Sequence, residues 1–150
     1  MMNLISMLQY DKWANDRTVA YMSESKLSDP RILSAFSHIV GAQKIWMERI
    51  KGKEHKKSEG ERSLEDCKVL LQTNYDEYME FLSWIQSDEV DSMVDYRDMQ
   101  GKSWSNSLRE IITHVCNHGT YHRGQIALLV RAEGDVPVAT DYIVMMREGK

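Results

Sequence analysis

The positions of the two prolines constrain the fold of this chain more than any other feature. Proline ends or kinks a helix, and Pro30 and Pro137 both fall at the edges of long segments with helical periodicity. With eight glycines in 150 residues, the chain between the prolines can remain helical over many turns. The sequence therefore predicts an all-α protein.

Four segments have apolar residues at the spacing of amphipathic helices. We expect helices over residues 3–24, 29–52, 63–85 and 105–133. Asp29 before Pro30 is a favourable helix start, and Ser63 resembles the start of a capping box. The last helix is expected to begin at Ser105 or Asn106 and to stop at Gly134.

Amphipathic helices of this length bury their apolar stripes by packing together, so we predict a four-helix bundle. The chain length suits one domain spanning residues 1–150. Residues 94–104, between the third and fourth helices, are expected to form a short hairpin or an extended loop. The tail, residues 138–146, is expected to pack against the body as a strand or short helix.

Charge and composition exclude several functional classes. The formal charge of −4 argues against nucleic-acid binding, which needs a concentrated positive field. The basic cluster at residues 49–57 contains acidic residues as well, so we interpret it as a solvated loop, with phosphate binding as the alternative. No apolar run is long enough to span a bilayer, and residues 1–11 do not resemble a signal peptide. Cys67 and Cys116 suggest buried packing thiols, so we expect a cytoplasmic protein.

Three of the five histidines, His114, His118 and His122, are four residues apart on the last predicted helix. Neighbouring members of such a series face the same way and can bind one metal ion, but all three cannot easily do so. His114 is rotated about 80° from His122 on helix geometry. His38, among the apolar residues of the second predicted helix, is expected to point into the bundle.

The candidate metal ligands are therefore His38, His118 and His122. Three neutral imidazoles with an open fourth position are typical of a catalytic zinc site or a related divalent site. The alternative is that these are hydrogen-bonded core histidines without a metal. Spacing alone leaves both interpretations open.

The segment Asn117–Ile126, NHGTYHRGQI, closely resembles the N-H-x-x-x-H-R-G-Q-I signature of the DinB-like family. Tyr10-x-x-Trp13-Ala14-Asn15 resembles the opening motif of that family. Ser37-His38-Ile39-Val40, followed by Trp46, resembles its second-helix segment. The resemblance implies a four-helix bundle, a homodimer, and a divalent metal held by His38, His118 and His122. His114 matches no ligand position, so a role beside the ligands or in the structure is expected for it.

Relatives in this family include transferases and isomerases that act through low-molecular-weight thiols. The resemblance therefore implies a metal-dependent enzyme with a small-molecule substrate, and a thiol-dependent S-transferase is the favoured reading. A metal-dependent hydrolase is the first alternative, and a non-catalytic metal-binding or ligand-binding bundle is the second. Zinc or nickel is the expected metal, with iron or copper as alternatives. No general base can be identified, and no membrane or nucleic-acid partner is expected.

The sequence also suggests contacts for several polar and aromatic residues outside the histidine set. Arg123 is expected to pair with a carboxylate of a neighbouring helix rather than to hold an anionic substrate. Asn15, Asp16 and Gln43 are candidate hydrogen-bond partners for the metal site, and Asp16 is also a candidate fourth ligand. The tryptophans are expected in the core or in a pocket wall. These are Trp13, Trp46 and Trp104.

Overall fold

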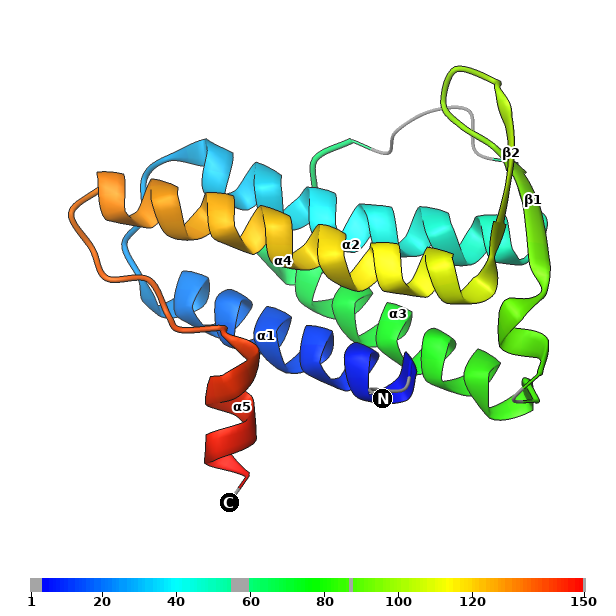
Figure 1. The fold of residues 1–150 in the computed structure, drawn as a ribbon. Coiled ribbons are helices and arrows are strands. Elements are labelled where there is room, and N and C mark those ends of the chain that lie inside the picture. The colour runs from blue at the N-terminus through cyan, green and yellow to red at the C-terminus, as the bar shows by residue number, and fades with distance from the viewer. Residues whose placement is uncertain (1–3, 55–59, 87, 150) are drawn as a thin grey trace.

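The computed structural model describes residues 4–54, 60–86 and 88–149, and it is mostly helical. Figure 1 shows four long helices lying side by side, in which α1 and α2 each contact both α3 and α4. The long helices are α1 (Leu4–Glu24), α2 (Pro30–Ile50), α3 (Leu64–Trp84) and α4 (Leu108–Ala132). A short 3₁₀ turn (Glu89–Asp91), the strands β1 (Met93–Arg97) and β2 (Ser103–Ser107), and a final helix α5 (Tyr142–Glu148) complete the fold.

The predicted helix starts hold at α2 and α3. The Asp29 carboxylate accepts a hydrogen bond from the backbone N–H of Arg31 at 2.9 Å. The Ser63 hydroxyl accepts one from the N–H of Asp66 at 3.1 Å. Each side chain satisfies a backbone donor that has no partner within its own helix.

The start predicted for the last helix is wrong by one or two residues, because Ser105 and Asn106 belong to β2. The N-cap of α4 is Ser107, whose hydroxyl accepts a hydrogen bond from the N–H of Glu110. The Glu110 carboxylate in turn accepts one from the N–H of Ser107 at 2.8 Å, which completes a capping box. The strand and the helix therefore meet at a single serine.

The segment between α3 and α4 is a hairpin, one of the two predicted alternatives. β1 and β2 pair antiparallel, with Tyr96 opposite Trp104. Asp98 organises the turn, since its carboxylate accepts hydrogen bonds from the backbone N–H groups of Gln100 and Lys102. Gly101 has φ of +82°, a conformation that favours glycine. The hairpin lies beside the end of α2 in Figure 1.

The tail ends in a short helix, as one of the two predicted alternatives had it. The Tyr10 hydroxyl on α1 donates a hydrogen bond to the carbonyl of Thr140 at 2.9 Å. The Tyr10 ring also meets the ring of Tyr142 edge-on, with centroids 5.3 Å apart. The tail is therefore held against α1 (Figure 1).

Two expectations from composition have definite outcomes. Cys67 and Cys116 are buried free thiols, as predicted. The solvated loop predicted for residues 49–57 is wrong at its first residue, because Arg49 is buried in the last turn of α2. Residues 55–57 of that loop lie outside the described residues. Within the described ranges, none of the helices combines the length and apolar character that a transmembrane span requires.

The interior consists of two hydrophobic clusters with a layer of polar side chains between them. One cluster includes Leu8, Met47, Tyr78 and Ile112, and the other includes Val19, Phe36, Leu71 and Ile126. Each long helix contributes to the layer between the clusters, which we call the polar layer. Its members are Asp11 and Asn15 of α1, Gln43 of α2, Asn74 of α3 and Arg123 of α4. All five side chains are buried.

Candidate metal centre

Three histidine side chains from two helices converge on one point. His38 of α2 lies opposite His118 and His122 of α4. The Nε2 atom of His118 is 3.2 Å from that of His38 and 3.1 Å from that of His122. One nitrogen from each ring lies within 4.8 Å of the other two, so the cluster can hold a metal ion.

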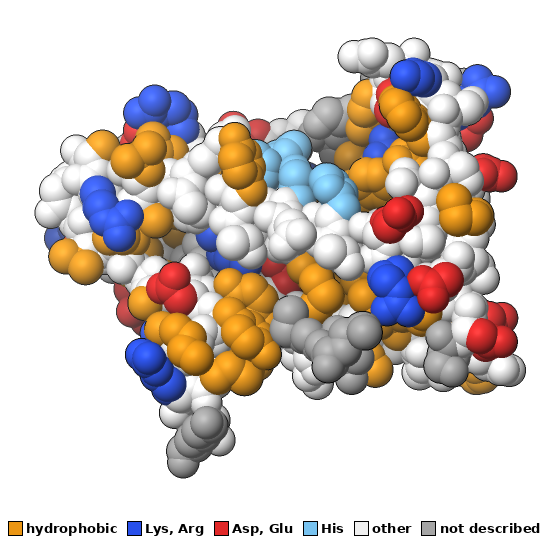
Figure 2. All heavy atoms as spheres, viewed as in Figure 1, with side chains coloured by type: hydrophobic (Ala, Val, Ile, Leu, Met, Phe, Trp, Pro, Cys, Tyr) orange, Lys and Arg blue, Asp and Glu red, His pale blue; other side chains and the backbone are white. Residues whose placement is uncertain are grey.

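The cluster lies at the molecular surface rather than in the interior. Figure 2 shows the histidine side chains gathered on the exposed face over α4. His38 is exposed, whereas His118 and His122 are half-buried. The prediction that His38 points into the interior is therefore wrong. Its neighbour Ile39 faces the core, and adjacent positions on a helix differ in direction by about 100°, which turns His38 to the rim of the α2–α4 interface.

The nitrogen separations fit a metal ion. Zinc–imidazole bonds of 2.0–2.1 Å in a tetrahedral arrangement place two ligand nitrogens about 3.3 Å apart. The angles between neighbouring ligands are smaller in an octahedral complex, and at similar bond lengths they place two ligand nitrogens about 3.0 Å apart. The observed separations of 3.1 and 3.2 Å lie between these two values. These two separations are thus compatible with either geometry, and the third pair of nitrogens lies within 4.8 Å.

The surroundings of the rings favour neutral imidazoles, the form that binds metals. Burial, followed by the proximity of His122, His38 and His114, lowers the pKa of His118 to about 4. Burial, followed by the proximity of His122, also lowers the pKa of His38. The lowered pKa values of His38 and His118 therefore favour the neutral form of these two rings at neutral pH.

Gln125 orients one of the three rings. Its amide oxygen lies 2.7 Å from Nδ1 of His122, three residues earlier on α4. Since this oxygen can only accept, Nδ1 of His122 carries the proton and its Nε2 lone pair faces the other two rings. Gln125 belongs to the family signature, but its contact with His122 was not predicted.

His114 lies beside the cluster and does not belong to it. The ring of His114 is exposed, with its centroid 5.5 Å from that of His118. On its other side it meets Trp46 edge-on, at a centroid distance of 5.1 Å. His114 therefore links the cluster to Trp46 along the α2–α4 interface.

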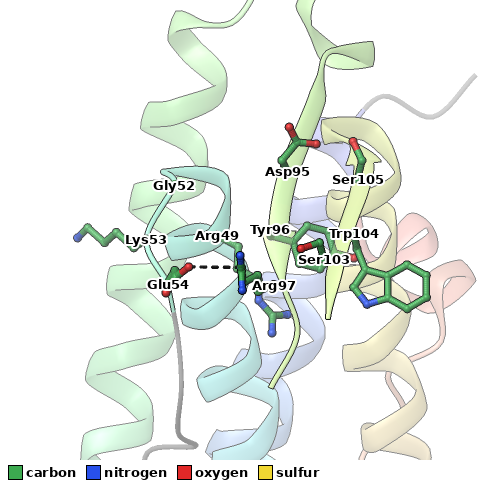
Figure 3. Close-up of a pocket in the computed structure, with 10 residues that line it drawn as sticks. All are labelled: Arg49, Gly52, Lys53, Glu54, Asp95, Tyr96, Arg97, Ser103, Trp104 and Ser105. Atoms are coloured by element: carbon green, nitrogen blue, oxygen red, sulfur yellow. Dashed lines mark ion pairs between the residues drawn. The ribbon is translucent and has the colours of Figure 1, made fainter. Parts of the chain in front are cut away.

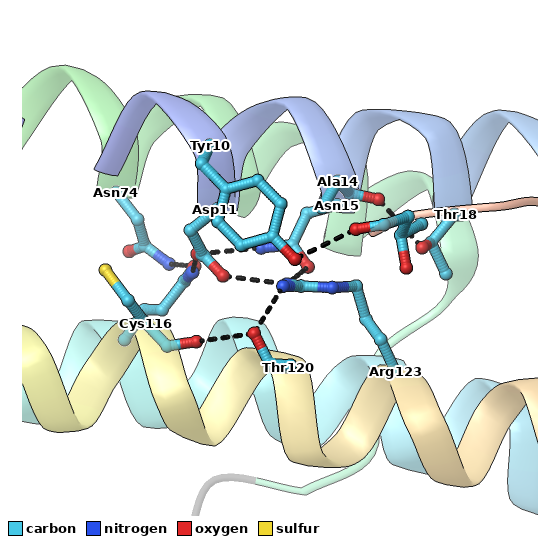
Figure 4. A network of polar contacts seen from close by, with 11 residues as sticks. Tyr10, Asp11, Ala14, Asn15, Thr18, Asn74, Cys116, Thr120 and Arg123 are labelled. Atoms are coloured by element: carbon cyan, nitrogen blue, oxygen red, sulfur yellow. Dashed lines mark hydrogen bonds and ion pairs between the residues drawn. The ribbon is translucent and has the colours of Figure 1, made fainter. Parts of the chain in front are cut away.

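Beneath the cluster, the polar layer joins α4 to the other helices (Figure 4). Arg123 and Asp11 form an ion pair at 2.7 Å, and their side chains are 2% and 3% exposed. Arg123 also donates to the amide oxygen of Asn15 at 2.8 Å and to the hydroxyl of Thr120 at 3.0 Å. The expectation that Arg123 pairs with a carboxylate of a neighbouring helix is confirmed.

Asp11 is the centre of the polar layer, and the sequence did not single it out. Its carboxylate accepts hydrogen bonds from the amides of Asn15 at 3.0 Å and Gln43 at 2.7 Å. Burial raises the pKa of Asp11, while its contacts with Arg123 oppose that change. Gly119 faces the same carboxylate, and a Cβ atom there would overlap an oxygen of Asp11. The close approach of α1 and α4 thus requires glycine at this position.

Three residues proposed as partners of the metal site act elsewhere. Asn15 and Gln43 bind Asp11 rather than the histidines. Asp16 pairs with Lys12 at 2.6 Å and is absent from the ligand cluster found among the described residues. The prediction of these three as partners of the site is therefore wrong, because the helix rotation directs them to other neighbours.

The tryptophans occupy pocket walls and half-buried positions. Trp13 and Trp46 are half-buried, and Trp46 lines a hollow together with His114. Trp104 is 44% exposed and lines a pocket at the hairpin. A core position is therefore wrong for Trp104, while its place in a pocket wall is as expected.

His38 opens onto two hollows on the surface. One, of about 350 Å³, lies between α2 and the segment before α3 and reaches Met99 at the hairpin turn. The other, of about 520 Å³, also includes His122, Gln125 and Leu128. Neither is lined by a residue of the tail after position 137. The tail, held on α1, leaves the cluster accessible to small molecules.

Comparisons with known proteins agree on one family. The model of the DinB family matches residues 1–149. Protein DinB of Bacillus subtilis (strain 168) is 26% identical in an alignment 153 residues long, gaps included. The alignment covers 89% of this chain and 88% of that protein. The crystal structure of a DinB-like protein from Bacillus cereus ATCC 10987 has the same fold, with a TM-score of 0.65 and 18% identity, over 89% of this chain and 95% of that one.

Proposed function

Because the chain belongs to the DinB family, we propose that it is a metal-dependent enzyme whose ion is held by His38, His118 and His122. The favoured reaction is thiol-dependent S-transfer to a small-molecule electrophile. The observation that carries the proposal is the convergence of three histidine rings at an accessible surface. The cluster includes no fourth protein ligand among the described residues, which is typical of catalytic rather than structural sites.

A divalent ion in this position supplies Lewis acidity and lowers the pKa of a thiol or water bound to it. The protein contributes ligand orientation through Gln125 and a shaped space on each side of His38. In S-transfer, the thiol releases its proton to solvent, its sulfur forms a bond to carbon of the electrophile, and the leaving group departs with its electron pair. Atoms and charge are then balanced without a protein base.

The scarcity of carboxylates among the described residues near the cluster favours S-transfer over hydrolysis. Among the described residues lining the two hollows at His38, Glu61 is the single carboxylate. Metal-dependent hydrolases commonly use a carboxylate general base beside the ion, whereas an ionised thiol needs none. Hydrolysis is therefore the second candidate, and a non-catalytic binding role is the third.

The remaining assignments belong to the same proposal. Zinc or nickel is the expected metal, with iron or copper as alternatives, since the nitrogen separations are compatible with more than one geometry. We also assign residues 1–150 to a single four-helix-bundle domain, supported by the mutual contacts of the four long helices. The family resemblance implies a homodimer, and the cysteine usage of the sequence favours a cytoplasmic location.

Cobalt substitution tests the reaction class. The purified protein, stripped with chelator and loaded with Co²⁺, is expected to give the visible absorption of a low-coordinate ion. Addition of a small thiol should then produce sulfur-to-cobalt charge-transfer absorption, which His118→Ala abolishes. A cobalt spectrum that changes with pH but not with thiol would favour hydrolysis. A spectrum insensitive to both would contradict an open catalytic site.

Replacing Gln125 with leucine should weaken metal binding without changing its stoichiometry. The substitution removes the acceptor that holds Nδ1–H of His122. Loss of such a partner typically reduces metal affinity about 10- to 100-fold. Competition with a chromogenic chelator measures the affinity, and Gln72→Leu, on the exposed face of α3, is the matched control. Equal affinity in the Gln125 and Gln72 variants would contradict the orienting role.

A further inference from the structure

A pocket of about 590 Å³ lies between the end of α2 and the hairpin (Figure 3). It is lined by Arg49 and Lys53 on the α2 side and by Asp95, Tyr96 and Arg97 of β1. Figure 3 shows the Arg49 side chain reaching into the space between the helix and the strand. This arginine was expected in a solvated loop, because it begins a segment of mixed charge.

Arg49 is a buried cation that forms no ion pair with a carboxylate of the described residues. Its residue is 7% exposed, and its guanidinium carbon lies 4.6 Å from the ring centre of Trp46 and 5.2 Å from that of Tyr96. Its Nε atom has no hydrogen-bond partner. No carboxylate within the described part of the chain forms an ion pair with it. Two aromatic rings thus hold a guanidinium that makes no hydrogen bond or ion pair within the described part of the chain.

The side chains that line the pocket carry a net positive charge, although Asp98 at the hairpin turn partly offsets the charge of Arg49. Arg97 pairs with Glu54 at 3.6 Å. Across the pocket, three cations (Arg49, Lys53 and Arg97) face two carboxylates (Glu54 and Asp95), which leaves one net positive charge. Asp98, the acidic residue of the hairpin turn, accepts hydrogen bonds from the Trp104 indole and two backbone N–H groups. Burying an unpaired charge is costly, so such a site favours an anionic ligand.

A chain of side-chain contacts leads from the pocket toward the histidines along the α2–α4 interface. Tyr96 also lines a second hollow, of about 250 Å³, together with Trp46 and His114. The ring of His114 lies 5.1 Å from that of Trp46 and 5.5 Å from that of His118. Arg49, Trp46, His114 and His118 therefore form one continuous row of contacts from the pocket to the metal centre.

We propose that the pocket at Arg49 binds an oxyanion, a carboxylate or phosphate group, carried by the small molecule that reacts at the histidine cluster. The planar fork of arginine donors matches both groups, and the flanking rings fix its orientation. The assignment of this anion to the substrate rests on the proposed function. The anion site itself rests on the contacts of Arg49.

Thermal unfolding of the metal-free protein in inorganic phosphate tests the site, with ionic strength held constant by sodium chloride. Phosphate is expected to raise the midpoint temperature of unfolding of the wild-type protein. A parallel titration with citrate shows whether carboxylates bind too. Arg49→Gln should weaken the apparent phosphate affinity at least tenfold. The control Arg131→Gln, an exposed position on α4, should behave as wild type. An Arg49→Gln variant that responds to phosphate as wild type does would overturn the proposal.

Nuclear magnetic resonance keeps the test valid if Arg49→Gln proves unstable. Phosphate added to the folded wild-type protein should shift the indole N–H signals of Trp46 and Trp104, which flank the pocket, more than that of Trp84. Trp84 lies at the end of α3 and is 80% exposed. Uniform or absent shifts would argue against binding at Arg49.

Metal and anion binding can be scored separately. His122→Ala is expected to lose the metal and keep the phosphate response, while Arg49→Gln is expected to keep the metal and lose that response. Phosphate binding in a protein that takes up no metal would support the anion site and contradict the proposed function. Metal binding without any phosphate response would support the metal site of the proposed function and contradict the anion site.

Discussion

Replacing His118 with alanine is expected to lower the metal content of the purified protein from about one ion per chain to a small fraction of that. His118 is the central member of the cluster, because its Nε2 lies within 3.2 Å of the Nε2 atoms of both His38 and His122. Its removal leaves two imidazoles on different helices. Elemental analysis before and after chelation and refilling measures the loss.

The neighbouring His114→Ala variant is the matched control. It removes an imidazole one helical turn away on the same face of α4, next to the ring of His118 but outside the cluster. Its metal content should equal that of the wild type. Similar losses in both variants would show that the ligand assignment is wrong, and the absence of metal from refilled wild-type protein would contradict the metal site altogether.

Replacing Arg123 with methionine is expected to lower the free energy of unfolding by about 3–5 kcal/mol, because Asp11 is left buried without its charged partner. For a chain of this length, this corresponds to a fall of roughly 10 °C in the unfolding midpoint. Urea unfolding followed by circular dichroism measures the change. Arg131→Met, on the exposed face of the same helix, should change the stability by less than about 0.5 kcal/mol.

A double variant shows whether the ion pair is the cause. Asp11→Asn removes the charge that Arg123 compensates, so the Asp11→Asn/Arg123→Met protein should be more stable than the sum of the single effects implies. We expect the coupling between the two positions to reach several kcal/mol, as for other buried pairs. Additive effects would show that Arg123 stabilises the protein through packing alone.

The sequence predicted the helices well because their apolar stripes and caps are local signals. The starts at Asp29 and Ser63 follow from side chains that cap their own backbone. The start of α4 was misplaced because Ser105, Asn106 and Ser107 are all suitable caps. The choice among them depends on how far β2 pairs with β1, which is not a local property.

The three histidines of the candidate site were predicted from the sequence, but their exposure and their neighbours were not. Helix geometry and the family signature both selected His38, His118 and His122, and the structure brings these three together. The exposure of His38 could not be predicted, because it depends on the rotation of α2 against α4. The same rotation decides that Gln43 reaches Asp11 rather than an imidazole.

Buried charges were the hardest feature to predict. Arg49 lies at the start of a charged segment, and nothing in the sequence distinguishes it from the solvated lysines that follow. Its burial results from the hairpin, which places Tyr96 against it. Contacts between segments far apart in the sequence therefore determine which of the charged residues become part of a site.

His122 and Arg123 are consecutive in the chain, yet one reaches the surface cluster and the other anchors the interior. Residues on the outward-facing side of α4, where the candidate metal ligands lie, can therefore change one at a time during evolution. Residues on its inward-facing side continue to hold the helices together. A lineage that lost its metal would keep its shape, and new chemistry could arise on the same rim without a new fold.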